Sequence, residues 1–357
     1  NLEEKLPSKK MVDYIIVGLG LAGLAFIEEL MTAKKTFVVF EDDSQTSSLV
    51  AGGVYNPVIL KRYSPVWNVK EQLALALPFY ERLEKKFDQE FDQKFVIKKA
   101  FKSIEDQNNW FSAFDKPKVA PYLDSKLDNQ TYNGVLGNHQ FGNVKEGGRI
   151  DTQKLVETYR EYLKENNWIR FENFNHNNIK FKDQTIQYQD IEVHKIVFAE
   201  GFGLKENPYF NHLPLEEVKG ETITIHAPEL EIDFLVKSTL FVMPIGHHQY
   251  KVGATFNHAD KTSIPSIEGK EELVAKLKKV LSVPYTIVDQ AAGIRPAVKD
   301  RRPMVGVHPQ FNNLAVLNGL GTRGVIISPT VAKQLFNHLE NEGKLDPETD
   351  IKRFEKK

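Results

Sequence analysis

Apolar and polar residues follow two different periods along this chain, and the change of period marks the predicted elements. Residues 14–17 are an uninterrupted apolar run, typical of a buried strand, and the run ends in a glycine-rich turn. The apolar positions then recur at helical spacing from Leu24 to Met31, and residues 36–41 return to a strand pattern that ends in an acid. The chain therefore begins with a predicted β-α-β unit.

Three glycines stand where the first strand turns into the helix. Gly18 permits a tight turn, Gly20 lets the backbone approach a pyrophosphate closely, and Gly23 lets the helix pack against the strand. The start of the helix, at Leu21 and Ala22, offers N–H groups and partial positive charge to phosphates. This spacing predicts a dinucleotide-binding site.

The second strand ends in Glu41, which is followed by Asp42. An acid at this point accepts hydrogen bonds from the ribose hydroxyls of a dinucleotide and disfavours a 2′-phosphate. The alternative to a dinucleotide site is a glycine-rich turn that only packs the helix against the strand. Glycines alone would be weak evidence for a dinucleotide site. The prediction therefore depends on the strand before the glycines and on the acid after them.

The middle of the chain alternates between charged helical segments and short strands. Residues 69–116 are predicted to be helical and heavily charged, and a further helix is predicted over 153–166. Three short strands and a buried strand at 195–198 follow, and the buried strand leads into Ala199-Glu200-Gly201. This order brings a second loop to the carboxyl ends of the strands, where the first glycine turn also lies.

The last part of the chain is rich in strands. Residues 217–256 alternate in a way that predicts an antiparallel sheet with one exposed face, and a helix is predicted over 269–281. A strand at 313–317 then leads into a second glycine loop, and a final helix is predicted to start near Ser328-Pro329.

Composition narrows the classes of protein. The 357 residues are 41% hydrophobic, which is enough for two domains, and the net charge of −1 gives no global basic footprint for nucleic acid. There is no cysteine, which excludes disulfides and thiolate metal sites. The pair His247-His248 is expected at an exposed hairpin tip, so no metal site is predicted.

Glu28 and Glu29 interrupt the early apolar run, and we expect a cytoplasmic protein without a membrane span.

Four separated parts of the chain together resemble one family of flavoenzymes. They are Gly18–Glu41, the loop 51–57, Ala199–Gly201, and Ala292–Pro296 continuing through Gly319–Ser328. On these motifs the chain resembles the FAD-dependent family of D-amino-acid oxidase, glycine oxidase and sarcosine oxidase. Within this family, residues 53–57, 293–306 and 319–324 are most similar to the oxidase half of the bifunctional enzyme that modifies the wobble uridine of tRNA.

The resemblance implies an α/β fold. A Rossmann-like FAD-binding domain of the glutathione-reductase-like kind would carry an inserted α+β substrate domain built on an antiparallel sheet. The implied boundaries are 11–65, 149–205 and 290–357 for the FAD-binding domain, 66–148 and 206–289 for the substrate domain, and 1–10 for a polar N-terminal extension.

The resemblance also implies FAD as a non-covalent cofactor and assigns residues to it. Glu41 would hold the adenosine ribose, Ser48 with residues 52–54 would line the pyrophosphate and flavin, and the backbone of 321–326 would approach the flavin ring. The implied cofactor-binding residues are Gly18, Gly20, Leu21, Ala22, Gly23, Glu41, Asp42, Ser48, Gly52, Gly53, Val54, Ala199, Glu200, Gly201, Gly321, Thr322, Gly324, Val325 and Ile326.

Two arginines are candidates for substrate binding. Arg295 would bind a substrate carboxylate, because a guanidinium is always charged and holds two oxygens in a planar fork. The alternative for Arg295 is a structural ion pair. Arg323 is a candidate second anion clamp, although glycine oxidases have the comparable arginine one position earlier, where this chain has Thr322.

Other positions depart from the family pattern. Phe241 and Phe256 stand where glycine oxidases carry a tyrosine and a methionine, and a glutamate, Glu200, stands beside the expected cofactor crevice. Free glycine is therefore doubtful as the substrate. The candidates for the missing hydroxyl are Tyr55, Tyr250 and Tyr285.

Three hypotheses for function follow. The first is an FAD-dependent enzyme that oxidises the C–N bond of an amino acid or N-substituted glycine by hydride transfer from Cα to flavin N5, with no certain catalytic residue of its own. The second is oxidation of carboxymethylaminomethyl-uridine in tRNA, which the neutral charge disfavours. The third is an FAD-binding protein without catalysis. The sequence defines neither the electron acceptor nor the oligomeric state.

Overall fold

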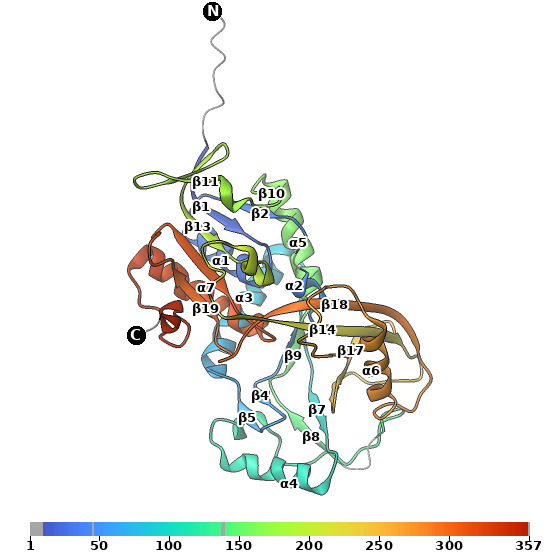
Figure 1. The fold of residues 1–357 in the computed structure, drawn as a ribbon. Coiled ribbons are helices and arrows are strands. Elements are labelled where there is room, and N and C mark those ends of the chain that lie inside the picture. The colour runs from blue at the N-terminus through green and yellow to red at the C-terminus, as the bar shows by residue number, and fades with distance from the viewer. Residues whose placement is uncertain (1–9, 45, 137–139, 356–357) are drawn as a thin grey trace, which may run out of the picture. The chain divides into compact units, whose positions relative to one another are not determined.

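The chain divides into two compact units in the computed structural model, which describes residues 10–44, 46–136 and 140–355 (Figure 1). Unit 1 consists of Asn1–Ser48, Val156–Glu217 and Arg295–Lys357, and unit 2 consists of Leu49–Leu155 and Val218–Ile294. The division differs from the boundaries expected from the sequence, because 49–65, 149–155 and 290–294 lie in unit 2 and 206–217 lie in unit 1. The binding roles of the two units stay predictions. Most of the expected N-terminal extension, residues 1–9, lies outside the described residues.

Unit 1 is built on an eight-stranded sheet whose centre is parallel. The run β10-β2-β1-β13 continues through β20, and β19 pairs with β20 in the antiparallel direction. Two further strands, β11 and β12, extend β13 as an antiparallel meander. The strands are β1 (Lys10–Val17), β2 (Phe37–Glu41), β10 (Ile169–Phe171), β11 (Ile179–Phe181), β12 (Ile186–Tyr188), β13 (Ile191–Phe198), β19 (Met304–Val307) and β20 (Leu314–Asn318).

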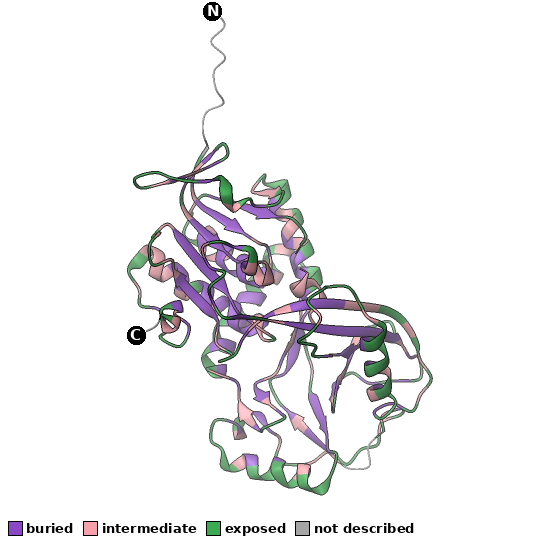
Figure 2. Cartoon of the chain, in the orientation of Figure 1, coloured by how far each residue is buried: buried purple, intermediate pink, exposed green. Residues whose placement is uncertain are grey.

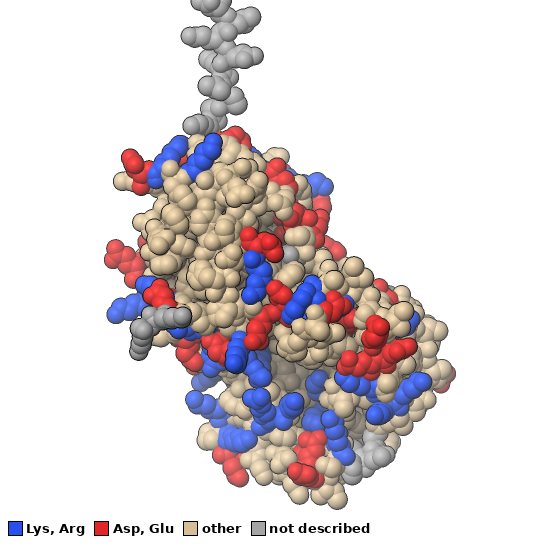
Figure 3. Space-filling view, viewed as in Figure 1, with Lys and Arg blue, Asp and Glu red and all other residues tan. Residues whose placement is uncertain are grey.

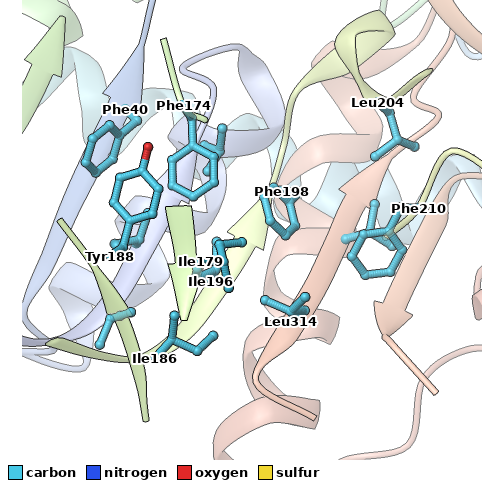
Figure 4. Close-up of a cluster of buried hydrophobic side chains, with 14 of the residues drawn as sticks. Phe40, Phe174, Ile179, Ile186, Tyr188, Ile196, Phe198, Leu204, Phe210 and Leu314 are labelled. Atoms are coloured by element: carbon cyan, nitrogen blue, oxygen red, sulfur yellow. The ribbon is translucent and has the colours of Figure 1, made fainter. Parts of the chain in front are cut away.

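Helices α1 (Leu21–Thr32) and α7 (Gly324–Asn341) pack against each other and against this sheet. Phe26 of α1 lies edge-on to Tyr14 of β1 and contacts Phe336 of α7. A separate cluster of buried aromatic and aliphatic side chains includes Phe174 stacked on Tyr188, with ring centroids 4.2 Å apart (Figure 4). The centre of this sheet is therefore apolar on both faces, as a parallel sheet requires, and its strands β2 and β20 are wholly buried (Figure 2).

Unit 2 is built on a seven-stranded sheet in the order β18-β14-β17-β16-β15-β7-β8. One face carries a hydrophobic cluster that includes Leu273 and Leu277 of helix α6. A small three-stranded sheet, β3-β9-β6, and a two-stranded one, β4-β5, complete the strands. The strands are β3 (Val54–Tyr55), β4 (Val58–Ile59), β5 (Ser64–Pro65), β6 (Asp92–Lys94), β7 (Ile97–Ala100), β8 (Phe141–Val144), β9 (Gly148–Ile150), β14 (Leu215–His226), β15 (Leu235–Lys237), β16 (Phe241–Gly246), β17 (Gln249–Gly253) and β18 (Thr286–Val298).

The other α-helices belong to unit 2 or cross the division between the two units. Helix α2 has its first residues in unit 1, and α5 has most of its length there. The α-helices are α2 (Ser47–Val50), α3 (Val69–Phe87), α4 (Ile104–Ser112), α5 (Thr152–Glu165) and α6 (Ile267–Leu277); the 3₁₀ helices of the chain are η1 (Ala113–Asp115), η2 (Ala120–Tyr122), η3 (His176–Asn178), η4 (Gly201–Glu206) and η5 (Ile351–Phe354).

Most predicted elements are present, and the fold class is confirmed, but two predictions about helices were wrong. Helix α3 ends at Phe87, and β6 and β7 occupy part of the charged stretch that was predicted to be helical. On β7 the charged residues Lys98 and Lys99 are buried in ion pairs with Asp128 and Asp106, so their charge does not mark a solvated helix face. Helix α7 starts at Gly324, before the predicted Ser328-Pro329 cap.

One expectation about the surface has a direct counterpart in the structure. His247 and His248 form the exposed turn between β16 and β17, as expected. The described residues contain no group of three or more His, Asp or Glu side chains that could hold a metal ion. The same residues contain no helix with the length and apolar character that crossing a membrane requires.

Candidate active site

The first glycine turn of unit 1 is shaped by close backbone contacts. Gly18 has a φ of +98°, and a Cβ on it would lie 2.5 Å from the carbonyl oxygen of Ala199. A Cβ on Gly23 would lie 2.1 Å from the oxygen of Gly18. Only glycine fits at either position, because a side-chain carbon never approaches a backbone oxygen so closely. The contacts give Gly18 and Gly23 the turn and packing roles expected from the sequence.

Gly20 is the N-cap residue of α1, and it lies beside Ser48. The Ser48 hydroxyl accepts a hydrogen bond of 3.2 Å from the Leu21 N–H, and a Cβ on Gly20 would lie 3.1 Å from the same hydroxyl. Ser48 thus reaches the positive end of the α1 dipole, where a phosphate is stabilised. The structure brings together these three residues, all expected to hold the cofactor.

Glu41 points from the end of β2 back to the first glycine turn. Its carboxylate accepts hydrogen bonds from the Leu19 N–H, at 2.5 Å, and from the Asp43 N–H, at 3.0 Å. Burial raises the pKa of Glu41, and the two backbone hydrogen bonds oppose that shift. A carboxylate has about four lone-pair positions, so these two bonds leave acceptor capacity for ribose hydroxyls. The neighbouring Asp42 accepts from the side chain of Asn173 at 2.7 Å.

The middle loop, Ala199–Gly201, follows β13 and is tied to β1 through the bond from the Ala199 N–H to the Val17 carbonyl. The carboxylate of Glu200 lies 2.8 Å from His176 Nε2 and accepts a 2.8 Å hydrogen bond from Asn207. Glu200, which was expected to add negative charge beside the cofactor crevice, therefore has its carboxylate bound by His176 and Asn207 within unit 1.

The closing loop, 319–324, connects β20 to α7. Gly321 has a φ of +58°, its N–H donates to the carbonyl of Pro296 at 2.9 Å, and nothing lies within 4 Å of a Cβ built on it. Thr322 is exposed, and Val325 and Ile326 are buried in the first turn of α7. Gly321 therefore faces open space that a bound molecule can occupy.

The two glycine turns bring two helix N-termini together. A Cβ on Gly324, the first residue of α7, would lie 3.3 Å from the side chain of Leu21, the first residue of α1. Ala22 follows in the same turn of α1 and is buried. Two adjacent positive helix ends are suited to a ligand with several phosphate oxygens.

The two candidate arginines lie next to the closing loop. Arg295 on β18 precedes Pro296, whose carbonyl binds the Gly321 N–H. Burial lowers the pKa of Arg295 to about 10, so it stays charged at neutral pH. Arg323 is the N-cap residue of α7, and its pKa is lowered by burial and by the positive charges of Arg301 and Arg302.

Unit 2 holds the remaining cofactor candidates. Gly53 has a φ of +66°, and a Cβ on it would lie 1.8 Å from the oxygen of Ile150. A Cβ on Gly52 would lie 3.2 Å from the ring of Phe241, and Val54 begins β3 and pairs with Arg149 of β9. The loop 52–54 and Phe241 are therefore neighbours within unit 2.

The tyrosines proposed to replace a missing hydroxyl are occupied elsewhere. Tyr55 is buried, and its hydroxyl donates to Asp92 at 2.7 Å. The Tyr250 hydroxyl donates to the carbonyl of Leu230, and Tyr285 packs against the hydrophobic cluster of unit 2. These contacts do not favour a substrate role for the three hydroxyls, which stays a prediction. Phe256 is 64% exposed.

The comparisons with known proteins match the motifs on which this site is built. The family model described as FAD dependent oxidoreductase matches residues 13–337. The chain belongs to this FAD-dependent oxidoreductase family. FAD is its cofactor.

Curated members of the FAD-dependent oxidoreductase family share short stretches with this chain. A glycine oxidase of Bacillus subtilis is 25% identical over 43% of the chain, and the match covers 42% of the relative's length. A tRNA 5-methylaminomethyl-2-thiouridine biosynthesis bifunctional protein MnmC of Marinobacter nauticus is 27% identical over 41% of the chain. The chain covers 26% of the length of that relative, so the activity of either protein does not transfer directly.

Solved structures of the family share the fold at low identity. Iminodiacetate oxidase from Chelativorans sp. BNC1 has a TM-score of 0.76 and 17% identity, and the match covers 94% of this chain and 99% of that one. Glycine oxidase from Geobacillus kaustophilus has a TM-score of 0.75 and 18% identity, with 94% and 96% covered. These likenesses show the fold over 94% of the chain.

The residues of unit 1 fit FAD on the structure's own evidence. The open space at Gly321, the paired helix N-termini and the remaining acceptor capacity of Glu41 are features that a dinucleotide uses. The assignment of single residues to parts of the cofactor stays a prediction.

One residue that positions the loops was missed from the sequence. Asn318, the last residue of β20, is buried; its amide donates to the Gly201 carbonyl at 2.8 Å and accepts from the Gly319 N–H at 2.7 Å. It ties the middle loop to the closing loop. The sequence feature that could have identified Asn318 is its place between a buried strand and a glycine. An asparagine side chain at such a place can form hydrogen bonds with the backbone N–H and C=O groups of the turn.

Proposed function

We propose that this protein is an FAD-dependent oxidoreductase acting on CH–NH donors, with an amino acid or an N-substituted glycine as its substrate. The observation that carries the proposal is Arg295, a largely buried guanidinium next to the closing loop, which the resemblance assigns to the cofactor. The names of the related glycine oxidases and iminodiacetate oxidase support this class of substrate.

Arg295 is suited to bind the carboxylate of such a substrate. A guanidinium in a partly dehydrated site binds a carboxylate through two parallel charge-assisted hydrogen bonds, which fix its direction as well as its position. Its backbone is held by the hydrogen bond between Pro296 and Gly321, so a bound carboxylate has a fixed location relative to the closing loop. Arg323 supplies a second positive charge at the start of α7.

The protein's contribution to the reaction is orientation and charge. Bound FAD supplies the acceptor for the two electrons and the hydrogen that leave the substrate carbon. Arg295 fixes the substrate carboxylate so that the adjacent carbon is presented in one orientation, an effect that lowers the entropic part of the barrier. The positive helix ends of α1 and α7 favour negative charge at the same place.

The test is anaerobic reduction of the FAD-loaded protein by sarcosine, glycine and iminodiacetate. The reduction is measured as the loss of flavin absorbance. We expect Arg295→Ala to bind FAD normally and to require at least about 100-fold more substrate for half-maximal reduction, since a charged bidentate contact contributes about 3 kcal/mol. Arg295→Lys should recover part of the effect. Arg302→Ala, at an arginine paired with Glu348 on the surface, is the matched control. Normal reduction of Arg295→Ala would contradict the proposal.

A second candidate function is the oxidation of a modified uridine in tRNA. It is favoured by the similarity to MnmC proteins and by the Lys and Arg side chains that gather over β4, β5 and β7 of unit 2 on the face shown in Figure 3. Polyanion binding through such a surface weakens steeply with salt. The discriminating measurement is the rate at which carboxymethylaminomethyl-uridine tRNA bleaches the flavin, compared with small amines, at low and high salt.

A further inference from the structure

Helix α4 of unit 2 exposes two large apolar side chains to solvent. Ile104 is 66% exposed and Phe111 is 46% exposed, and residues seven apart in a helix lie on the same stripe, two turns from each other. A different side of the helix is anchored by Trp110, which is fully buried and which a Cβ on Gly142 of β8 would approach to 2.7 Å. Most of the remaining surface of α4 is exposed (Figure 2), so the stripe of Ile104 and Phe111 is not what holds the helix in place.

Positive charge gathers next to this helix (Figure 3). Tyr63, in the turn between β4 and β5, connects the segments that carry it: its hydroxyl donates to Asp106 of α4 at 2.7 Å, and its carbonyl accepts from the Lys116 ammonium at 2.9 Å. Asp106 also forms an ion pair with Lys99 at 2.7 Å. Residues 61–63 and 99–118, which these contacts join, hold six cations, Lys61, Arg62, Lys99, Lys102, Lys116 and Lys118, and three carboxylates, Glu105, Asp106 and Asp115.

Helix α6 provides a comparison within the same unit. Ile267 is 73% exposed and directly follows the capping Ser266, as Ile104 directly follows the capping Ser103 in α4. The charge next to the two isoleucines differs, because residues 268–272 hold three glutamates and one lysine. An exposed isoleucine at the start of a helix is therefore common to both helices, and an excess of positive charge accompanies it only at α4.

The two features together fit the surface of a membrane that contains anionic lipids. An exposed aliphatic or aromatic side chain gains free energy by entering the boundary between headgroups and acyl chains, and nearby lysines are attracted to acidic headgroups. A nucleic-acid backbone would use the same cations, but it would leave the aliphatic side chain of Ile104 in water. Two apolar side chains and a few cations suit a reversible contact with the membrane surface.

We propose that α4 and the cations of 61–63 and 99–118 bind the surface of a membrane with anionic lipids. Ile104 and Phe111 enter the boundary between headgroups and acyl chains, and the exposed Lys61, Arg62 and Lys118 contact the headgroups. The inference is independent of the proposed function, because it concerns unit 2 alone and no step of the oxidation depends on it.

Flotation of the FAD-loaded protein with lipid vesicles tests the apolar part of this surface. We expect binding to vesicles of phosphatidylcholine with phosphatidylglycerol at low salt, and at least about 10-fold weaker binding to phosphatidylcholine alone or at high salt. The double variant Ile104→Asn, Phe111→Asn should bind the anionic vesicles at least about 10-fold more weakly than the wild type. Ile267→Asn, at the corresponding position of α6, is the matched control and should bind as the wild type does.

A charge reversal tests the basic part. The double variant Lys61→Glu, Arg62→Glu should lose binding to the anionic vesicles, whereas Lys278→Glu, Lys279→Glu, at two exposed lysines after α6, should keep most of it. All substituted positions are in unit 2, and none has a role in the oxidation. Reduction of the flavin by amines in solution should therefore be the same in every variant, so this inference and the proposed function can fail separately.

Three results would overturn the inference. The first is binding that does not depend on phosphatidylglycerol, and the second is binding that survives in the double variant of Ile104 and Phe111. The third is binding of tRNA that is tighter than binding of the vesicles and unchanged in that same double variant, which would show a surface for nucleic acid instead.

Discussion

The two glycine loops of unit 1 look alike in sequence and differ in packing. In the first loop, Cβ atoms on Gly18 and Gly23 would lie 2.5 and 2.1 Å from backbone oxygens. In the closing loop, a Cβ on Gly321 would meet nothing within 4 Å, and one on Gly324 would meet the side chains of two leucines, the nearer at 3.3 Å. The first loop needs glycine for the fold, whereas the closing loop keeps space for a ligand. Identical residues at similar motifs therefore predict different consequences of substitution.

The largest expected effect is that of Gly23→Ala. The new methyl group cannot coexist with the Gly18 oxygen, and overpacking against backbone costs about 3 kcal/mol or more. We expect the free energy of unfolding of the FAD-free protein, measured by urea denaturation, to fall by that amount. Gly324→Ala is the matched control, because it places the same methyl group in the first turn of the other helix and should change stability by less than about 1 kcal/mol. Equal losses in the two variants would remove the distinction between the loops.

Asn318→Ala should produce the next largest effect. The substitution leaves the Gly201 carbonyl and the Gly319 N–H without their side-chain partner, and an unsatisfied buried group costs about 1–3 kcal/mol. Because the residue joins the middle and closing loops, FAD affinity should fall together with stability. Asn318→Asp, which keeps the acceptor for Gly319 and loses the donor to Gly201, should be intermediate in a thermal melt. An unchanged melting temperature in both variants would show that the link is not needed.

A smaller loss of stability is expected for Gly321→Ala. Its φ of +58° makes a side chain unfavourable by about 1–2 kcal/mol, and no atom stands in the way of the methyl group. FAD affinity, measured by fluorescence titration of the FAD-free protein, should fall at least 10-fold, more than the loss of stability alone explains. FAD binding that is unaffected would mean that the open space is not used by the cofactor.

The smallest expected effect concerns pH. Burial raises the pKa of Glu41 above its usual value, so acidification protonates this carboxyl earlier than an exposed one. Protonation removes an acceptor from the Leu19 N–H and from a ribose hydroxyl, so FAD affinity should decrease as the pH falls through the raised pKa and be retained above it. Glu41→Gln should bind FAD more weakly at neutral pH and show a flatter pH dependence. If the FAD affinity of the wild-type protein does not change as the pH falls through the raised pKa of Glu41, the assignment of Glu41 to the ribose is wrong.

The sequence predicted the cofactor side of the molecule better than the rest. The spacing from Gly18 to Glu41 determines a β-α-β unit through contacts that are local in the chain, and the structure contains that unit. The strands β6 and β7 were missed because the charged residues of this stretch, Lys98 and Lys99 among them, were interpreted as a solvent-exposed helix face. The carboxylates that pair with these two lysines, Asp128 and Asp106, come close to them only in the folded structure.

Packing between distant segments also hid one feature of the candidate site. Helix α7 starts at Gly324 without a side-chain cap hydrogen bond, and it packs against α1. Residue types and spacing reveal a site built from one segment, whereas a site built from distant segments requires the folded structure.

The pairing of β20 with β13 has a consequence for how the protein is made. Residues 196–198 of β13 pair with residues 314–316, so this part of the β13 edge has no partner on the ribosome until residue 316 has emerged, whereas residues 191–193 can already pair with β12. An unpaired apolar strand in a nascent chain is a template for aggregation. Synthesis in cells is therefore expected to depend on chaperones that hold this strand, and fragments ending before residue 314 should be recovered as inclusion bodies.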